Sequence, residues 1–433
     1  MIKILYSILF FILVSNCSFN KNSKFWSDTK ELKVENNLEY KEIFPSEETL
    51  KREFNSNLRI KFTSNPINSS TNNYLNNSNR LNFNGDLKKS SRHKFSKIEN
   101  FGKYEPELTF SKKSLIFFDS KGSIFKLDDK SKLIWKKNYY SKSEKKLKPV
   151  LQLANNNKFL IVADSIAKYY KVNLENGNLV WSKNNLAPFN SQIKIYEDKF
   201  FIVDLSNTLR CFSLKTGDEL WNIKTEDTLI RSQKKLSMVI INDNIYFNNS
   251  IGDITAVDIK KGEMIWQLPT QSNLIYESAF SLKTSDLVSD EKSLFFSNNK
   301  NQFFSVDIAS GSFNWQNKIS SNLRSTLIDN YIISISTDGY LIITEKKSGN
   351  ILRVTDVFQN FNSKKRKKIQ PVGFVVGLNN IYLTTSNGRI SMIDITSGKT
   401  ISTKKVDDEK ISRPFIQNEN LFLIKDNAII KLN

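Results

Sequence analysis

The sequence has almost no histidine and very little cysteine, and these two absences exclude whole classes of site. One histidine, His93, and two cysteines, Cys17 and Cys211, stand among 433 residues. A disulfide framework and a zinc site made of Cys and His are therefore excluded. No Gly-rich phosphate loop and no Ser/His/Asp set is present. Because the chain has a single histidine, most general-base chemistry would have to fall to carboxylates.

Glycine and proline are also scarce, with 14 and 8 residues, whereas aromatic residues make up 12% of the chain. An aromatic and β-branched bias favours strands over helices and is enough to bury a sizeable core. Turns must then be built from Asn, Asp and Ser, which tolerate the left-handed backbone conformation. The composition therefore favours an all-β fold.

Acidic residues are too few to balance the basic ones. Lys and Arg number 64 against 44 Asp and Glu, which gives a formal charge of +20. Such a charge can attract nucleic acid, anionic lipid or an acidic protein partner, or it can be spread over the whole surface without a specific role. No zinc finger, RNP-type motif or basic helix is present, which argues against a nucleic-acid binder.

The N-terminal apolar run is too short to cross a bilayer. It covers residues 4–14, whereas a spanning helix needs about 20 residues, so we interpret residues 1–16 as a secretory signal peptide. The segment LVSNC, which ends at Cys17, is similar to a bacterial lipobox, although Asn16 departs from the usual Gly, Ala or Ser. The resemblance implies a lipid on Cys17, with plain cleavage or an uncleaved anchor as the alternatives.

A polar stretch follows, from residue 17 to residue 93, with tracts such as NPINSSTNN at 65–73. Such a composition cannot bury enough apolar surface to fold alone, so we expect a flexible tether with a reach of roughly 50 Å. Ser18 is not the aspartate that retains lipoproteins in the inner membrane. The resemblance therefore implies the periplasmic face of the outer membrane.

One unit recurs between residues 94 and 433. It consists of short strands separated by Asn, Asp or Gly turns, and its last strand ends in tryptophan four positions after a glycine. The tryptophans keep the register, with steps of 46, 40, 45 and 49 residues: Trp135, Trp181, Trp221, Trp266 and Trp315. Two later copies keep the frame without the ring, at Arg353 and Ser402.

Four-stranded units at this period predict a β-propeller. We count eight blades, beginning near residues 105, 148, 190, 236, 279, 324, 371 and 413, with seven blades as the alternative. The last blade has room for three strands only. Its fourth strand should come from about residues 94–100, which would close the ring.

The blades carry AVDI at 256–259, GEMIW at 262–266 and GDELW at 217–221. They resemble pyrroloquinoline-quinone-type propeller repeats, and with the lipobox the chain resembles the BamB family of outer-membrane barrel-assembly lipoproteins. The resemblance covers about residues 94–433, and the polar stretch before them is a departure. It implies a monomeric, non-enzymatic scaffold without a cofactor, which binds the POTRA domains of BamA and assists insertion of outer-membrane proteins.

Two other functions remain open: a periplasmic propeller that binds another envelope protein or a glycan, and a quinoprotein dehydrogenase. A dehydrogenase often needs a vicinal disulfide, and no vicinal cysteine pair exists. All tryptophans except Trp26 occupy the repeated structural position. The recurring aspartates Asp258, Asp307 and Asp394 favour turn capping over a metal site.

Partner contacts are expected where connections between blades meet one rim of the propeller. Several connections are basic: residues 142–148, 231–235 and 364–368. The best specific candidate is Leu229-Ile230-Arg231, because apolar residues beside an arginine are typical of an interface anchor. This segment also resembles the partner-binding loop of the BamB family. An ordinary connecting loop or a solvated charge run is the alternative for each.

Overall fold

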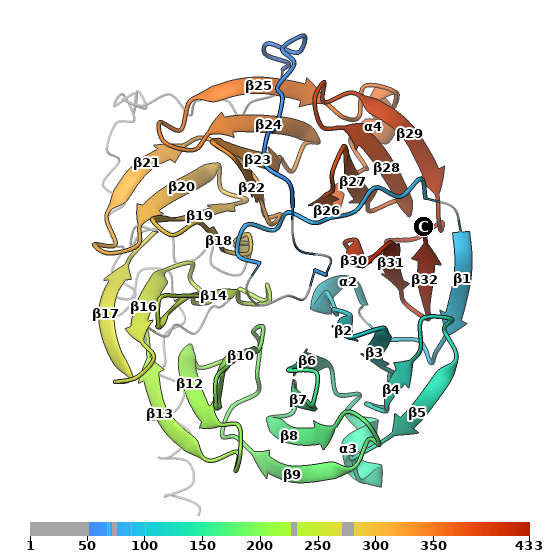
Figure 1. Ribbon diagram of the computed structural model, residues 1–433, viewed down its shortest axis with the longest axis vertical. Helices are drawn as coiled ribbons and strands as arrows, with labels where there is room; N and C mark the ends of the chain where they lie inside the picture. Colours follow the sequence, from blue (N-terminus) through green and yellow to red (C-terminus); the bar gives the residue numbers. More distant parts are fainter. Residues whose placement is uncertain are drawn as a thin grey trace, which may run out of the picture. The chain divides into compact units, whose positions relative to one another are not determined.

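The computed structural model describes residues 52–66, 68, 70–71, 76–87, 89–99, 101–226, 232–270 and 281–433. These residues form eight four-stranded antiparallel sheets around a central axis (Figure 1). The predicted eight-bladed propeller is thus confirmed. Within the described ranges, no helix has the length and apolarity that crossing a membrane requires.

The first four blades follow the chain from the innermost strand outwards. Blade 1 is β2 (Thr109–Ser111), β3 (Ser114–Phe118), β4 (Ile124–Leu127) and β5 (Leu133–Lys137). Blade 2 is β6 (Leu151–Asn155), β7 (Phe159–Asp164), β8 (Lys168–Asn173) and β9 (Leu179–Asn184). Blade 3 is β10 (Lys194–Tyr196), β11 (Lys199–Val203), β12 (Thr208–Ser213) and β13 (Glu219–Lys224). Blade 4 is β14 (Met238–Ile241), β15 (Asn244–Asn248), β16 (Ile254–Asp258) and β17 (Glu263–Leu268).

The next three blades repeat this order, and the eighth joins the two ends of the propeller. Blade 5 is β18 (Val288–Ser289), β19 (Ser293–Asn298), β20 (Gln302–Asp307) and β21 (Phe313–Asn317). Blade 6 is β22 (Thr326–Ile328), β23 (Tyr331–Ile335), β24 (Tyr340–Glu345) and β25 (Ile351–Asp356). Blade 7 is β26 (Pro371–Val376), β27 (Asn380–Thr385), β28 (Arg389–Asp394) and β29 (Thr400–Lys405). Blade 8 is β30 (Phe415–Gln417), β31 (Asn420–Lys425), β32 (Ala428–Leu432) and β1 (Lys89–Lys94). The described helices are short: α2 (Phe101–Tyr104), α3 (Lys142–Lys146) and α4 (Ser363–Arg366).

The core lies between blades, because the middle strands of a blade are buried on both faces. In β15 four of the five residues are buried, whereas in β17, the outer strand of the same blade, none is. One hydrophobic cluster joins Val239 and Tyr246 of blade 4 to Phe296 and Phe304 of blade 5. A single sheet cannot cover both of its faces, so stacking the blades in a ring is what buries them.

Each repeat tryptophan packs against the glycine turn of the following blade. At the junction of blades 4 and 5, Gly311 has a φ of +72°, and a Cβ added there would lie 2.6 Å from Trp266. Trp266 Nε1 also donates a hydrogen bond to the carbonyl of Ile308, at 2.9 Å. The same ring-to-glycine contact joins four other pairs: Trp135 and Gly177, Trp181 and Gly217, Trp221 and Gly262, and Trp315 and Gly349.

Strand β1 closes the ring by pairing antiparallel with β32, with His93 opposite Ile429. The sequence placed this strand slightly later, at about residues 94–100. The strand ends at Lys94 because the following residues pack on blade 1 instead. Phe95 lies 5.2 Å from Phe117 between ring centroids, and Ile98 is buried.

Residues 52–87, which we call the strap, depart from the expected free tether. The strap crosses the propeller in Figure 1 and forms isolated β-bridges with Val354, Val376 and Gln417. Four of its apolar side chains are buried, namely Ile60, Leu81, Phe83 and Leu87, whereas Phe54 and Leu58 are exposed. Its asparagines bond to blade backbone, as when Asn79 Nδ2 donates to the carbonyl of Ser325 at 3.2 Å. The polar composition therefore supplies hydrogen bonds to strand ends, which composition alone could not show.

Arg353 occupies the tryptophan position of blade 6. Its side chain is fully buried, and a Cβ added to Gly398 would lie 3.0 Å from its Nη2. Nη2 donates to the carbonyl of Ile395 at 3.2 Å, and Nη1 donates to the carbonyl of Leu58 in the strap at 2.9 Å. The arginine therefore fills the ring slot and ties the strap to blades 6 and 7.

Candidate functional site

The connections between blades and the turns between second and third strands lie on one face, because antiparallel strands alternate in direction. We call it the connection face, and its described connections are residues 138–150, 185–193, 318–325, 357–370 and 406–414. The strap bonds to turns at the opposite strand ends, through Asp329, Leu378 and Thr396. The turns that the strap covers therefore lie opposite the connection face, although the strap also bonds to Arg324 and Ser325 of the connection between blades 5 and 6.

The predicted partner-binding residues Leu229, Ile230 and Arg231 lie outside the described residues, as does Cys17. The connection resumes at Ser232, whose Oγ donates to the carbonyl of Leu282 at 2.5 Å. Leu282 belongs to the connection between blades 4 and 5. Two successive connections are thus joined beside the predicted contact.

Two neighbouring connections expose large apolar side chains that the sequence analysis missed. Leu186, between blades 2 and 3, is 96% exposed, and Leu147, between blades 1 and 2, is 65% exposed. Leu147 caps α3, whose start is fixed by a capping box of Ser141 and Glu144. Single exposed apolar side chains are common on protein surfaces, so these two leucines are interface candidates because they lie on connections next to the predicted contact. The usable sequence signal was a leucine inside a polar connection.

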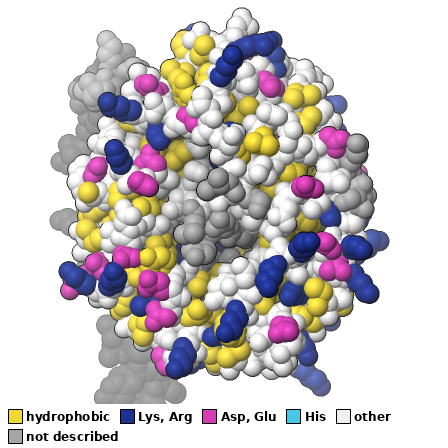
Figure 2. Space-filling view, in the orientation of Figure 1, with side chains coloured by type: hydrophobic (Ala, Val, Ile, Leu, Met, Phe, Trp, Pro, Cys, Tyr) yellow, Lys and Arg dark blue, Asp and Glu magenta, His cyan; other side chains and the backbone are white. Residues whose placement is uncertain are grey.

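The face that Figure 2 shows carries no single basic patch. There Lys and Arg side chains are scattered around the ring, with Asp and Glu side chains among them. In α4, Arg366 forms an ion pair with Asp356 and its guanidinium lies 5.1 Å from the ring centroid of Tyr340. Part of the predicted basic run therefore stabilises the fold.

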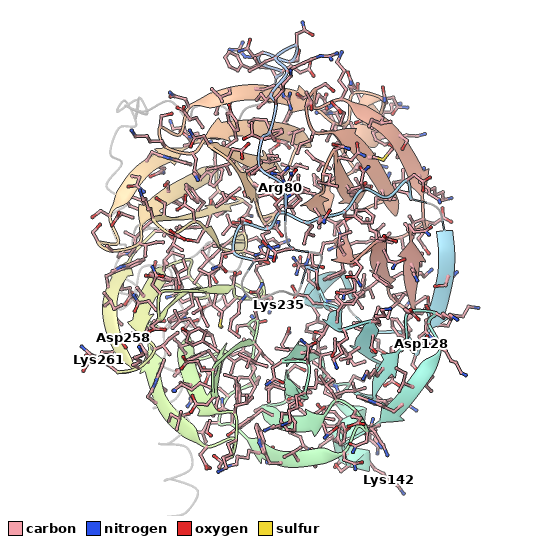
Figure 3. All side chains as sticks on the ribbon, viewed as in Figure 1. Arg80, Asp128, Lys142, Lys235, Asp258 and Lys261 are labelled. Atoms are coloured by element: carbon pink, nitrogen blue, oxygen red, sulfur yellow. The ribbon has the colours of Figure 1, made fainter. Side chains whose placement is uncertain are left out.

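The repeated aspartates cap turns, as predicted. Asp258 Oδ1 accepts hydrogen bonds from the backbone amides of Lys260 and Lys261, both at 2.8 Å. Asp307 accepts from the amide of Ser310 at 2.8 Å and Asp394 from that of Ser397 at 2.6 Å. Figure 3 places Asp258 at the outer edge of the ring, away from the central channel.

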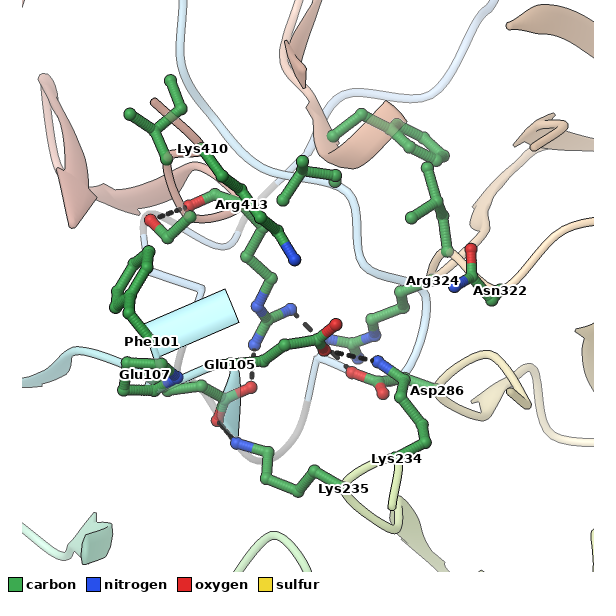
Figure 4. Close-up of a pocket in the computed structure, with 17 residues that line it drawn as sticks. Phe101, Glu105, Glu107, Lys234, Lys235, Asp286, Asn322, Arg324, Lys410 and Arg413 are labelled. Carbon is green, nitrogen blue, oxygen red and sulfur yellow. Dashed lines mark hydrogen bonds and ion pairs between the residues drawn. The ribbon is translucent and has the colours of Figure 1, made fainter. Parts of the chain in front are cut away.

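Charged side chains meet where the central channel opens between the connections (Figure 4). Lys234 pairs with Glu105 at 2.7 Å, and Lys235 pairs with Glu107 at 2.9 Å. Glu107 also pairs with Arg413. These ion pairs join the segment before blade 1 to blades 4 and 8 across the channel.

The cations hold both glutamates in their charged form. Burial alone would raise the pKa of Glu105, but Lys234, Lys410 and Lys235 outweigh it and lower that pKa to about 2. Burial would likewise raise the pKa of Glu107, yet Arg413 and Lys235 lower it. Both glutamates are therefore ionised near neutral pH.

Five polar side chains that line the channel, two of them members of this network, share a position that the sequence analysis overlooked. Each stands two residues before the innermost strand of its blade: Glu107, Gln192, Asp286, Arg324 and Arg413. In blades 2, 4 and 7 the same position holds Pro149, Leu236 and Ile369, and the last two belong to the hydrophobic core. Aligning the blades on their innermost strands, rather than on their tryptophans, would have placed the five polar residues in one column.

Cys211 lies far from any such chemistry. It is fully buried in β12 opposite Trp221, and burial raises the pKa of its thiol to about 12. A thiol held protonated in this way is inert as a nucleophile. Its role is to fill space between blades 3 and 4.

Comparison with known proteins gives a family and a set of similar folds. The family described as outer membrane protein assembly factor BamB matches residues 120–355. No curated protein matches the chain in sequence.

Two similar solved structures illustrate how widely the fold is shared. BamB from Moraxella catarrhalis is 14% identical, with a TM-score of 0.63 over 80% of this chain and 97% of that one. Quinohemoprotein alcohol dehydrogenase from Comamonas testosteroni is 8% identical, with a TM-score of 0.62 over 84% of this chain and 80% of that one. At such identities the likeness establishes the fold alone.

Proposed function

This chain belongs to the family of the outer membrane protein assembly factor BamB, and from that premise we propose that it is a non-catalytic scaffold of the outer-membrane barrel-assembly machinery. The observation that carries the proposal is the family match, which spans more than half of the chain. The fold by itself would not suffice, because a dehydrogenase has a similar one.

The proposed partner is a POTRA domain of a BamA-type protein, bound at the connection face. Leu229, Ile230 and Arg231 are the proposed anchors, and exposed Leu186 and Leu147 extend the surface across the neighbouring connections. A large apolar side chain surrounded by polar residues is the usual centre of a protein interface. The strap bonds to turns at the opposite strand ends and to Arg324 and Ser325 in the connection between blades 5 and 6. These contacts do not involve Leu147 or Leu186.

We also propose that a lipid on Cys17 anchors the chain to the periplasmic face of the outer membrane. The polar and positively charged surface fits a protein that works beside a membrane without entering it. The chain would act as a single subunit of the assembly complex, with no nucleic-acid partner.

A catalytic role is the less favoured function. At the channel mouth Glu105 and Glu107 are each engaged by lysine or arginine, so neither is poised as a general base near neutral pH. The five repeat tryptophans lie on outer strands, where they pack against glycine turns. Neither arrangement offers a stacking floor or a proton acceptor for a bound quinone.

The test is binding of the whole chain, purified in detergent, to POTRA domains from the same organism. The whole chain is needed because the strap contributes buried side chains. We expect saturable binding that weakens at least tenfold, or about 1.4 kcal/mol, in Leu186→Glu and in Arg231→Glu. Lys261→Glu is the control, because Lys261 is exposed on a turn at the outer edge (Figure 3).

Two outcomes would count against the proposal. If the folded wild-type chain does not bind, the partner is another envelope protein or a glycan, to be sought by crosslinking. If Lys261→Glu weakens binding as much as Leu186→Glu does, the contact is only a general effect of charge.

A further inference from the structure

A cavity of about 500 Å³ lies in the central channel, lined by strap residues Ser70 and Thr71 and by Lys194, Arg324 and Arg413. We propose that this cavity binds a small organic or inorganic oxyanion, a phosphate or carboxylate group, through Lys194 and Arg324. The site is distinct from the proposed partner surface on the connection face, and it does not depend on the proposed function.

The first reason is that Lys194 and Arg324 lack the acidic partner that neighbouring cations have. Lys234, Lys235 and Arg413 each form an ion pair with a glutamate. Among the described residues, no carboxylate lies within 4.0 Å of the charged nitrogens of Lys194 or Arg324. A buried charge without a counterion is costly, so an anion from solution would stabilise this part of the channel.

The second reason is the hydrogen-bonding state of the Arg324 guanidinium. Nη2 donates to the carbonyl of Asn76 in the strap at 2.9 Å, which holds the group in place. Nε is buried and has no acceptor in the described chain. In Figure 4 Arg324 reaches toward the middle of the channel, where a ligand oxygen could accept from it. A planar guanidinium held in this way is suited to an oxyanion.

The third reason is electrostatic. Burial, and then the positive charge of Arg324, lower the pKa of Lys194 to about 8. Burial also lowers the pKa of Arg324 to about 10. Asp286 and Glu107 offset part of this shift in the pKa of both groups, and an anion bound between the two cations would offset more of it. The nearby carboxylates are already engaged: Glu107 by Lys235 and Arg413, and Asp286 by Gln192 Nε2 at 3.1 Å.

The size and position of the cavity favour a small molecule. About 500 Å³ falls in the range of metabolite-sized sites. The cavity lining includes Ser70 and Thr71 of the strap and Glu107 and Arg413 of the ion-pair network. A folded partner could not enter such a space, whereas a diffusible anion could.

The test is titration of the whole folded chain with inorganic phosphate and with succinate, followed by calorimetry at constant ionic strength. The two probes separate phosphate from carboxylate recognition. We expect saturable binding of at least one probe, weakened at least tenfold in Arg324→Gln and in Lys194→Gln. Lys261→Gln, which changes an exposed lysine, should bind like the wild type.

Arg324→Lys is the second variant at that position, because it keeps the charge and retains part of the affinity if the site is real. A sulfate titration adds a pH readout, since the charge of sulfate is constant above neutral pH. Affinity should fall between pH 7 and pH 9 as Lys194 loses its proton beside Arg324, Arg413, Glu107 and Asp286. The proposal is overturned if neither probe saturates, or if both glutamine variants bind like the wild type.

Discussion

Blades 1–5 and blades 6–8 are held to their neighbours by different side chains. At five consecutive junctions, from blades 1 and 2 to blades 5 and 6, a tryptophan of the outer strand packs on the glycine turn of the next blade. These five contacts repeat one local packing arrangement. Each of them can be found from the spacing in the sequence.

From blade 6 onwards the tryptophan is missing, and the strap supplies what the repeat has lost. Ile60 joins the hydrophobic cluster of blades 6 and 7, and Leu81, Phe83 and Leu87 join that of blades 7 and 8. Arg353 fills the ring slot of blade 6 and bonds to the strap. A non-repeating segment can therefore replace a repeated side chain.

The difference shows that a repeat protein can lose its consensus side chains at junctions that another segment covers. A closed ring needs every junction sealed, because one open junction exposes two sheet faces. Sequence drift in blades 6–8 is tolerated here because a distant segment covers the same junctions. The stability of these blades should then depend on the strap, whereas blades 1–5 should depend on their own side chains.

The largest expected effect comes from removing the main apolar anchor of the strap. Phe83 is 3% exposed and lies 4.9 Å from Tyr382 between ring centroids. Phe83→Ala should lower the free energy of unfolding by about 3–4 kcal/mol, because it leaves a cavity between blades 7 and 8. Urea denaturation followed by circular dichroism measures the change.

The control for that variant lies in the same segment. Phe54 is 50% exposed and is held by backbone hydrogen bonds to Val354, so Phe54→Ala should change the free energy of unfolding by less than about 0.5 kcal/mol. Equal effects of the two substitutions would show that the strap does not seal the junction through its buried side chains.

A somewhat smaller loss of stability is expected at Arg353, which occupies a tryptophan position and also bonds to the strap. Arg353→Met keeps much of the side-chain volume but leaves the carbonyls of Leu58, Ile395 and Thr396 without their donor. The expected cost is about 2–3 kcal/mol in the free energy of unfolding. Hydrogen exchange of the strap should rise at the same time.

Arg92→Met provides the matched control, since Arg92 is exposed on β1. It should leave both stability and exchange unchanged. An Arg353→Met variant as stable as the wild type, with a protected strap, would mean that shape alone fills the slot.

The tryptophan-sealed half can be tested at one glycine. Gly311→Ala places a Cβ 2.6 Å from Trp266 at a φ of +72°, so the ring must shift and the backbone is strained. We expect a loss of about 1–2 kcal/mol, with the strap unaffected. Gly102→Ala in α2 has open space, the nearest atom being 3.7 Å away, and should be neutral or slightly stabilising.

The eight blades and the closing strand followed from the sequence because their signals are local and repeated. Gly262 and Trp266 carry the same information as Gly311 and Trp315. The strap could not be predicted, because Leu81 and Phe83 stand alone in a polar stretch. Their burial depends on faces of blades 7 and 8 that lie about 300 residues away in the chain.

The candidate site likewise has one part that the sequence predicts and another that it does not. The sequence indicated that connections would share one face, since strand direction alone decides this. It could not reveal the channel network, because Glu107, Lys235 and Arg413 are unremarkable charges until the ring brings them together. The sequence therefore predicts Lys235 only as part of a basic connection, and nothing in it singles out Glu107 or Arg413.

The smallest effect is expected at the carboxylate that anchors the strap to blade 6. Asp329 accepts hydrogen bonds from the amides of Thr63, at 2.7 Å, and Ser64, at 3.1 Å. Partial burial alone would raise the pKa of Asp329, but these hydrogen bonds from Ser64 and Thr63 outweigh it and lower that pKa. Asp329→Asn should lower the free energy of unfolding by about 1 kcal/mol at pH 6.

This contribution should depend on pH in a predictable direction, which separates the strap from the tryptophan seals. A lowered folded-state pKa gives stability that is present above the unfolded value of about 3.9. It is lost as the pH falls through the folded value. The difference between wild type and Asp329→Asn should therefore shrink below about pH 4, while Asp129→Asn, at an exposed position in blade 1, should match the wild type throughout. If the difference persisted unchanged at pH 3, the carboxylate charge would not be what holds the strap, and the anchoring would have to be assigned to Ile60 and Phe62 packing between blades 6 and 7.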